Sequence, residues 1–241
     1  QLNTWHNLRN TLYRSLQNQN CSVWTTIIRH ESQAYPEGDY EAGFSHDLNN
    51  KYRQSIQKQK LYVNEMYISL VLKAPFDIPL LSSFFNKKLD LEAQHQLKAL
   101  QELSDITQKV FNLLQGYEPE RLAIYTHKEV LYSKVYEFFG YLINGEYRKI
   151  PLTTTSADTI LNTSRLSFGV ESFEIRACSS SLYGATIGIK EYAPQSSPGM
   201  LDHLLHLPCS FILTQSFTCI SKPVAVQKMT IQKNKMVSQN L

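Results

Sequence analysis

The sequence is poor in glycine, with nine in 241 residues, and no phosphate-binding loop is present. Such a loop follows the pattern G-x-x-x-x-G-K-[ST], in which backbone amides and a lysine bind phosphates and a hydroxyl binds Mg²⁺. The nearest spacing is Gly140…Gly145, but Glu146 and Tyr147 follow it. The Glu146 carboxylate would repel a phosphate. We therefore expect that this chain does not bind or hydrolyse ATP and holds no other cofactor.

Cysteines are also scarce. The four of them, Cys21, Cys178, Cys209 and Cys219, form no CxxC pair and no spacing typical of a disulfide framework. An unpaired cysteine behaves as a small hydrophobic residue, so we expect free thiols in a reducing compartment. A nucleophilic serine in a G-x-S-x-G turn is absent as well, which removes the strongest local sign of a hydrolase.

Long hydrophobic runs are missing. Uninterrupted apolar runs such as Leu70–Leu72 fall far below the roughly 18 residues of a membrane span, and Gln1 opens a polar segment rather than a signal peptide. A net charge of +3 is too small to indicate a nucleic-acid-binding face. These features predict a soluble, cytoplasmic protein without direct nucleic-acid binding. Because the sequence lacks an initial Met and ends on a lysine-rich helix, we expect a piece of a longer protein.

Hydrophobic periodicity predicts an α+β or α/β fold, with a mixed sheet of about six strands covered by helices. Strands are expected over residues 21–31 and 61–73, and shorter ones over 122–127, 165–168 and 172–177. Both faces of the 21–31 strand are apolar, which places it inside a sheet covered on two sides. An apolar stripe over residues 86–115 predicts a helical arm of about 45 Å. Further helices are predicted over residues 4–16, 45–59, 129–144 and 222–239, and the polar loop 153–158 marks a candidate internal boundary near 150–160.

Residues 183–217 are the most informative part of the sequence. Their pattern predicts a strand over Tyr183–Tyr192, a short helix over Gly199–Leu207 that ends at Pro208, and a strand over Ser210–Phe217. We expect this segment to form structural core, with these side chains buried: Ile187, Ile189, Leu204, Phe211 and Leu213.

In this order the segment resembles the signature stretch of the N-terminal domain of the VirB/TrbE/CagE family of type IV secretion (conjugation) ATPases. Four further strings occur in the family's order, so that the resemblance extends over roughly 210 residues. They are Val23–His30, Tyr35–Gly38 with its following helix, Tyr62–Tyr67 and Gly169–Ile175.

The resemblance implies a domain with no catalytic, cofactor-binding or metal-binding residues of its own. In the family, the full-length protein is a hexameric ATPase whose C-terminal domain uses ATP and Mg²⁺. It powers channel or pilus assembly and transport of protein or DNA across the bacterial envelope. This chain then corresponds to a docking and oligomerisation module, peripheral at the cytoplasmic face of the inner membrane. Its implied partners are other inner-membrane components of the system, further copies of itself and its own C-terminal ATPase domain, which lies outside residues 1–241.

Two short clusters indicate other chemistry less strongly. His203, His206 and Cys209 have a spacing suited to zinc, but Pro208 breaks the helix before Cys209 and no fourth ligand is near in sequence. The carboxylates of Asp39, Glu41, Glu171 and Glu174 have no neighbouring nucleophile or histidine, so we interpret them as solvated charges.

Three alternatives to this interpretation stay open. One is a stand-alone α/β enzyme with a pocket near Asn64 and Glu65 or near Glu171. Another, less favoured, is a nucleic-acid-binding domain that stacks bases on the Lys/Tyr segments 58–62 and 147–149. Finally, the apolar stripes of the predicted helices 86–115 and 129–144 are able to dock a partner helix, although burial within the domain is favoured.

Overall fold

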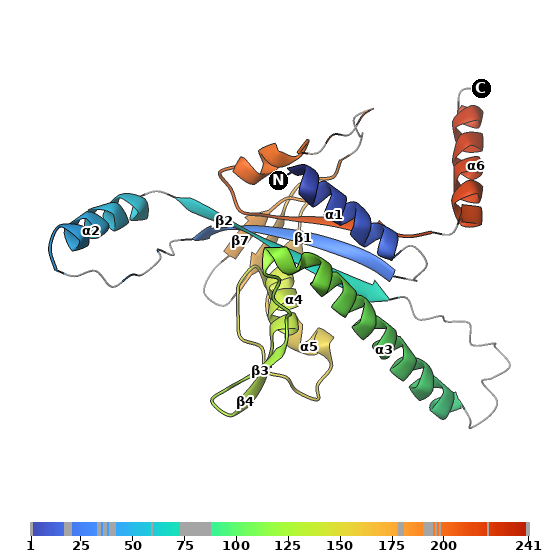
Figure 1. The fold of residues 1–241 in the computed structure, drawn as a ribbon, viewed down its shortest axis with the longest axis horizontal. Coiled ribbons are helices and arrows are strands. Elements are labelled where there is room, and N and C mark those ends of the chain that lie inside the picture. The colour runs from blue at the N-terminus through green and yellow to red at the C-terminus, as the bar shows by residue number, and fades with distance from the viewer. Residues whose placement is uncertain are drawn as a thin grey trace. The chain divides into compact units, whose positions relative to one another are not determined.

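The fold of the chain is α+β, as the sequence predicted. The computed structural model describes residues 2–16, 21–32, 35, 38, 42–58, 60–72, 88–177, 181–189, 195, 197, 199–220 and 222–239. These residues form six α-helices, eight strands and short 3₁₀ helices. The chain divides into two compact units, residues 1–117 with 197–241 and residues 118–196, so that the loop 153–158 lies inside the second (Figure 1).

The first unit is built on a three-stranded antiparallel sheet. Its strands are β1 (Cys21–Ser32), β2 (Leu61–Leu72) and β8 (Phe211–Thr218), in the order β2-β1-β8. The observed bounds agree with the predicted strands to within a residue or two. Val23 and Ile28 point to opposite faces of β1, since successive side chains alternate, and both are buried. The prediction that this strand is covered on two sides is confirmed.

Two helices supply the core on one face of this sheet. They are α1 (Leu2–Ser15) and α3 (Lys88–Leu114), and the buried residues that they share with β1 are Leu12, Leu16, Cys21, Val23, Ile106, Val110 and Leu114. Among the described side chains of α3, those in this core lie in the C-terminal half, whereas Leu97 and Leu100 are each 62% exposed. The helix is therefore an arm, as the length of its stripe predicted.

Two further helices of the first unit bury little. The helix α2 (Phe44–Gln57) comes between β1 and β2 and has no buried residue. The helix α6 (Lys222–Gln239) follows β8, and Val226, Met229 and Ile231 on it are exposed. Both helices lie where the apolar periodicity predicted them.

The second unit starts with a hairpin of which the sequence predicted the first strand, over residues 122–127, but not the second. Its strands are β3 (Ile124–His127) and β4 (Val130–Ser133), joined by Lys128 and Glu129, whose φ angles are 48° and 65°. Two residues with positive φ suit the twist of a two-residue hairpin loop, although glycine or asparagine usually provides them. The predicted helix 129–144 was therefore wrong in its first turn.

The helix α4 (Lys134–Asn144) follows this hairpin directly. The Ser133 side chain caps it by accepting a hydrogen bond from the Tyr136 amide, at 3.3 Å. Gly145 ends it with a φ of 71°, as the Asn144-Gly145 pair predicted.

The rest of the second unit contains the short helix α5 (Ala157–Leu161) and a second three-stranded antiparallel sheet. This sheet has β5 (Arg165–Phe168), β6 (Phe173–Arg176) and β7 (Ser181–Gly184) in sequential order. The strands described here thus form three antiparallel sheets, of three, two and three strands, in place of the one mixed sheet expected.

The core predicted over residues 183–217 was partly wrong. Ile187 and Ile189 are 92% and 51% exposed, and Leu204, Phe211 and Leu213 are half-buried. The reason is that β7 ends at Gly184, so that residues 185–189 have no strand beside them in the described part of the chain.

The short helix predicted over Gly199–Leu207 is a 3₁₀ helix, η3 (Asp202–His206). Tyr192 lies outside the described residues.

Candidate functional site

A buried arginine joins three of the segments that carry the family resemblance. Arg29 on β1 is 7% exposed, and its Nε donates to the Leu207 carbonyl at 2.8 Å. Its Nη1 donates to Asn64 Oδ1 on β2 at 3.0 Å. The guanidinium carbon lies 4.6 Å from the centre of the Tyr62 ring, and the Tyr62 hydroxyl donates to the Pro208 carbonyl at 3.0 Å. The chain that follows η3 is thereby held against β1 and β2.

Arg29 was not among the residues predicted from the sequence, although one signal was available: it is a charged residue near the end of a strand that is apolar on both faces. Asn64 was considered for an enzyme pocket together with Glu65. The structure does not bring these two side chains together, because neighbouring residues of a strand point to opposite faces. Asn64 instead accepts from Arg29, and Glu65 accepts a hydrogen bond from Tyr67 at 2.7 Å.

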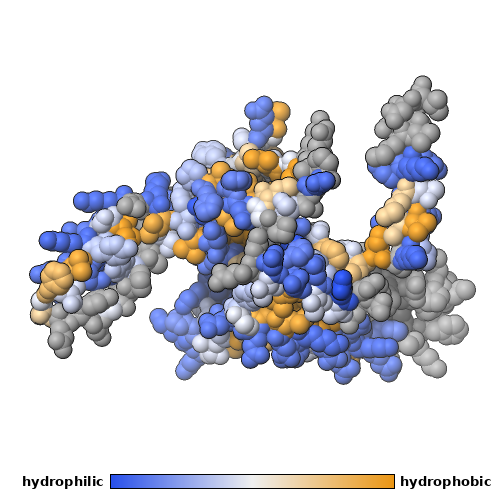
Figure 2. All heavy atoms as spheres, turned by 45° about the horizontal axis from the view of Figure 1, so that its top comes forward, coloured by the Kyte–Doolittle hydropathy of each residue, from blue (hydrophilic) through white to orange (hydrophobic). Residues whose placement is uncertain are grey.

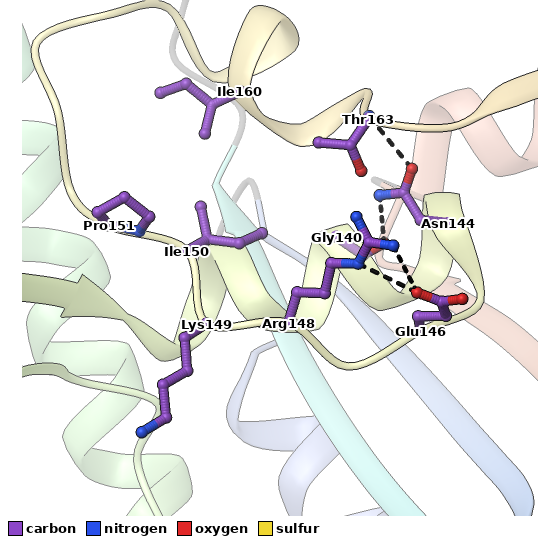
Figure 3. Close-up of a pocket in the computed structure, with 9 residues that line it drawn as sticks. All are labelled: Gly140, Asn144, Glu146, Arg148, Lys149, Ile150, Pro151, Ile160 and Thr163. Carbon is purple, nitrogen blue, oxygen red and sulfur yellow. Dashed lines mark hydrogen bonds and ion pairs between the residues drawn. The ribbon is translucent and has the colours of Figure 1, made fainter. Parts of the chain in front are cut away.

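The second unit has a small cavity of about 150 Å³ beside α4 (Figure 3). Asn144 on its wall is buried and uses its whole amide: Nδ2 donates to the carbonyls of Gly140 and Leu161, at 2.8 and 2.7 Å. Its Oδ1 accepts from the amides of Thr163 and Ser164, at 3.3 and 3.0 Å. An amide with four such partners has no hydrogen-bonding capacity left for a ligand. The lining residues are Gly140, Asn144, Glu146, Arg148, Lys149, Ile150, Pro151, Ile160 and Thr163.

Two of the three charged residues that line this cavity are paired with each other. The Arg148 guanidinium donates twice to the Glu146 carboxylate, at 3.0 and 2.7 Å (Figure 3). Gly140 lies within α4, and Gly145 caps its C-terminus. A phosphate-binding loop precedes a helix, where the dipole is positive, whereas these glycines lie toward the negative end. The closest spacing to a phosphate loop is therefore part of a helix and its C-terminal cap.

The other residues considered for chemistry lie apart. His203, His206 and Cys209 are exposed, and within the described ranges no three His, Cys, Asp or Glu side chains are placed to hold a metal ion. Glu171 is exposed. Asp39 and Glu41 lie outside the described residues.

Glu174 belongs to a cross-strand network on the second unit's sheet. Its carboxylate accepts from Arg176 at 2.9 Å and from the Tyr183 hydroxyl at 3.3 Å. The hydrogen bond from Arg176, with a further one from Ser181, holds the pKa of Glu174 below its usual value. A carboxyl group that ionises so readily is poorly suited to act as a general acid at neutral pH.

Apolar side chains gather instead on exposed surfaces. On α2, Phe44, Leu48 and Tyr52 follow each other at intervals of four residues and are 81%, 55% and 60% exposed. A spacing of four residues places them along one face of the helix, which we call the α2 stripe. Figure 2 shows apolar residues at the surface of α2, at the left of the view, and of α6, at the right. Strongly exposed apolar residues of the second unit are Phe168, Val170, Tyr183 and Ile187.

Comparison with known proteins defines the class of protein to which this fold belongs. Residues 120–240 match the CagE, TrbE, VirB family, a component of the type IV transporter system. Residues 1–78 match the N-terminal domain of the type IV secretion system ATPase VirB4/TrbE. The chain belongs to the CagE/TrbE/VirB family, as its signature stretch indicated.

No helix in the described part of the chain combines the length and hydropathy of a membrane span.

Particular relatives carry the name virB4. The type IV secretion system protein virB4 of Bartonella henselae is 33% identical over 242 residues, which cover 99% of this chain and 31% of the relative. The corresponding protein of Brucella melitensis is 27% identical over 236 residues, 94% of this chain and 28% of the relative. Protein virB4 of Agrobacterium fabrum is 25% identical over 230 residues, 95% of this chain and 29% of the relative. The chain thus spans less than a third of the length of these curated relatives.

Proposed function

We propose that this chain is the non-catalytic docking and oligomerisation region of a type IV secretion ATPase. The full-length protein would use ATP and Mg²⁺ in a C-terminal domain to power channel or pilus assembly and the transport of protein or DNA across the bacterial envelope. Its location would be peripheral, at the cytoplasmic face of the inner membrane. The proposal rests on family membership and on the way in which apolar side chains are distributed over the described surface.

The observation that carries the docking role is the α2 stripe. The stripe places three large, exposed side chains on one face of a helix that has no buried residues. Because removal of apolar surface from water is favourable, a partner that covers this face would gain free energy. Single exposed apolar residues are ordinary, but a regular stripe of them is typical of a helix that docks through that face. We assign this face to another inner-membrane component of the secretion system.

We assign two other exposed surfaces to the remaining proposed partners. The exposed residues Phe168, Tyr183 and Ile187 of the second unit suit contact with a further copy of the chain. The exposed apolar residues of α6, Val226 and Met229, suit contact with the C-terminal ATPase domain, because α6 is the last element of the chain described here.

The docking role is tested with Phe44→Asp/Leu48→Asp in the full-length protein. We expect the amount of inner-membrane components that co-purify with it to fall at least about tenfold, while ATP hydrolysis by the purified protein is unchanged. The matched control is His46→Asp/Gln54→Asp, which adds the same charges to exposed positions of α2 away from the stripe. If both variants retain the components equally well, the α2 stripe is not the docking surface.

A further inference from the structure

Two of the free cysteines lie at the adjoining ends of the neighbouring strands β1 and β8. The strands β1 and β8 are antiparallel, and their pairing runs from Arg29 with Phe211 to Ser22 with Thr218. The next residue on β1 is Cys21, and the next residue after β8 is Cys219. The last pair is further joined through its side chains, since Ser22 Oγ and Thr218 Oγ1 lie 2.8 Å apart. Continued by one residue beyond the end of β8, this register places Cys21 opposite Cys219.

The pKa of the Cys21 thiol agrees with this placement. Burial raises the pKa of the Cys21 thiol, and the neighbouring Cys219 raises it further, an effect that falls off with distance. Opposed residues of antiparallel strands have Cα atoms about 4.5 or 5.5 Å apart. Disulfides span Cα distances of about 4.4–6.8 Å. A bond between the two sulfurs is thus compatible with this register.

We propose that Cys21 and Cys219 form a dithiol site that closes to a disulfide by exchange with a small-molecule disulfide. Both cysteines are free in the structure, and the site belongs to the first unit alone. Neither CxxC spacing nor any other local pattern reveals it, because nearly the whole chain separates the two residues. The site is independent of the docking role proposed above.

The accessibility of the two thiols sets the order of the reaction. Cys219 is half-buried, whereas Cys21 is 2% exposed, so the Cys219 thiolate attacks the reagent first. This step forms a mixed disulfide and releases one small thiol. The Cys21 sulfur then attacks the Cys219 sulfur, which forms the Cys21–Cys219 bond and releases the second small thiol. The two protein thiol protons pass to the released thiols, and two electrons pass from the protein to the reagent.

The bond has a defined consequence for the fold. Cys219 lies between the end of β8 and the start of α6 at Lys222. A disulfide to Cys21 ties this connection to the start of the central strand. Formation of this disulfide therefore restricts the backbone between β8 and α6. It also links the N-terminal and C-terminal parts of the first unit covalently.

The test treats the reduced, folded chain with oxidised glutathione, followed by peptide mapping. We expect a peptide that links Cys21 to Cys219, and a rise of about 5 °C or more in the melting temperature, because the bond restricts the unfolded chain. Cys209, which is exposed, serves as the internal control and should gain a glutathione adduct. Cys219→Ser should remove the linked peptide and the rise in melting temperature, whereas Cys209→Ser should leave both.

One pattern of reaction overturns the proposal. If Cys209 is fully modified while Cys219 stays reduced, or carries a stable glutathione adduct without a linked peptide, the two sulfurs are not placed to react. Because this result is read from the folded wild-type chain, it does not depend on whether a Cys21 variant folds.

Discussion

At the scale of single residues, Arg29 shows how this fold compensates for a buried charge. Burying a guanidinium is costly unless its donors find acceptors, and here a backbone carbonyl and an amide oxygen supply them. Its partners come from β2 and from the chain after η3, so the charge holds together segments that are far apart in sequence.

We predict that Arg29→Ala lowers the free energy of unfolding by about 1.5–3 kcal/mol, the range of hydrogen bonds to charged groups, with some further loss from the Tyr62 contact. Arg14→Ala is the control, because Arg14 is exposed at the end of α1 and should change stability by less than about 0.5 kcal/mol. Urea unfolding of both variants measures the difference. Equal stability of the two would mean that Arg29 contributes no more than a surface residue.

Glu174 gives a prediction about pH. Arg176 lowers the pKa of this carboxyl group, so the charged form is favoured in the folded state. The ionised Glu174 therefore stabilises the folded state above pH 4.5, the ordinary pKa of this group. This stabilisation of the folded state is lost as the pH falls through the lowered pKa of the folded protein. NMR titration of the Glu174 carboxyl carbon should give a pKa below 4.5 in the wild type and a higher one in Arg176→Gln. The same pKa in both proteins would rule out Arg176 as the cause.

At the scale of elements, the sequence predicted the long ones well. The strands β1 and β2 and the helices α2, α3 and α6 were recognised because each carries its own periodicity over a dozen residues or more. The strand β3 was predicted, but β4 and the hairpin that they form were missed because the turn consists of Lys128 and Glu129, which give no glycine or asparagine signal. The strand β7 was predicted to start later and to extend further, because residues 185–189 keep a strand-like pattern without a neighbouring strand to pair with.

The helix α6 provides the prediction at this scale. A helix of 18 residues is marginal in water and depends on packing, yet Val226 and Met229 are exposed. If the C-terminal ATPase domain covers this helix, its end should exchange amide hydrogens rapidly in residues 1–241 alone and slowly in the full-length protein. Hydrogen exchange over residues 230–239 measures this. Strong protection in both proteins would show that α6 is stabilised without that domain.

At the scale of the whole molecule, the cavity beside α4 offers little to a ligand, whereas several described surfaces expose apolar side chains. The Asn144 amide of the cavity beside α4 is fully hydrogen-bonded, and the Arg148–Glu146 pair there is satisfied internally. Exposed apolar side chains lie on α2, on α6 and on the second unit, and also on α3, where Leu97 and Leu100 are exposed.

We predict that residues 1–241 alone do not bind ATP in the presence of Mg²⁺, because the glycine spacing closest to a phosphate loop lies in α4 and its cap. Calorimetric titration of ATP into the chain should give no measurable heat of binding. Titration into the full-length protein is the positive control. Micromolar, Mg²⁺-dependent binding to residues 1–241 would contradict the prediction and revive the alternative of an enzyme.

The sequence by itself determined the fold class, the long elements and the family, since these depend on local periodicity and on the order of short strings. Only the tertiary structure decided which residues meet. Arg29 binds a carbonyl 178 positions away, and Ser22 contacts Thr218 across 196 positions, with Cys21 and Cys219 beside them. The physical reason is that such contacts depend on strand register, which is set by the packing of the whole sheet and leaves no trace in the spacing of neighbouring residues.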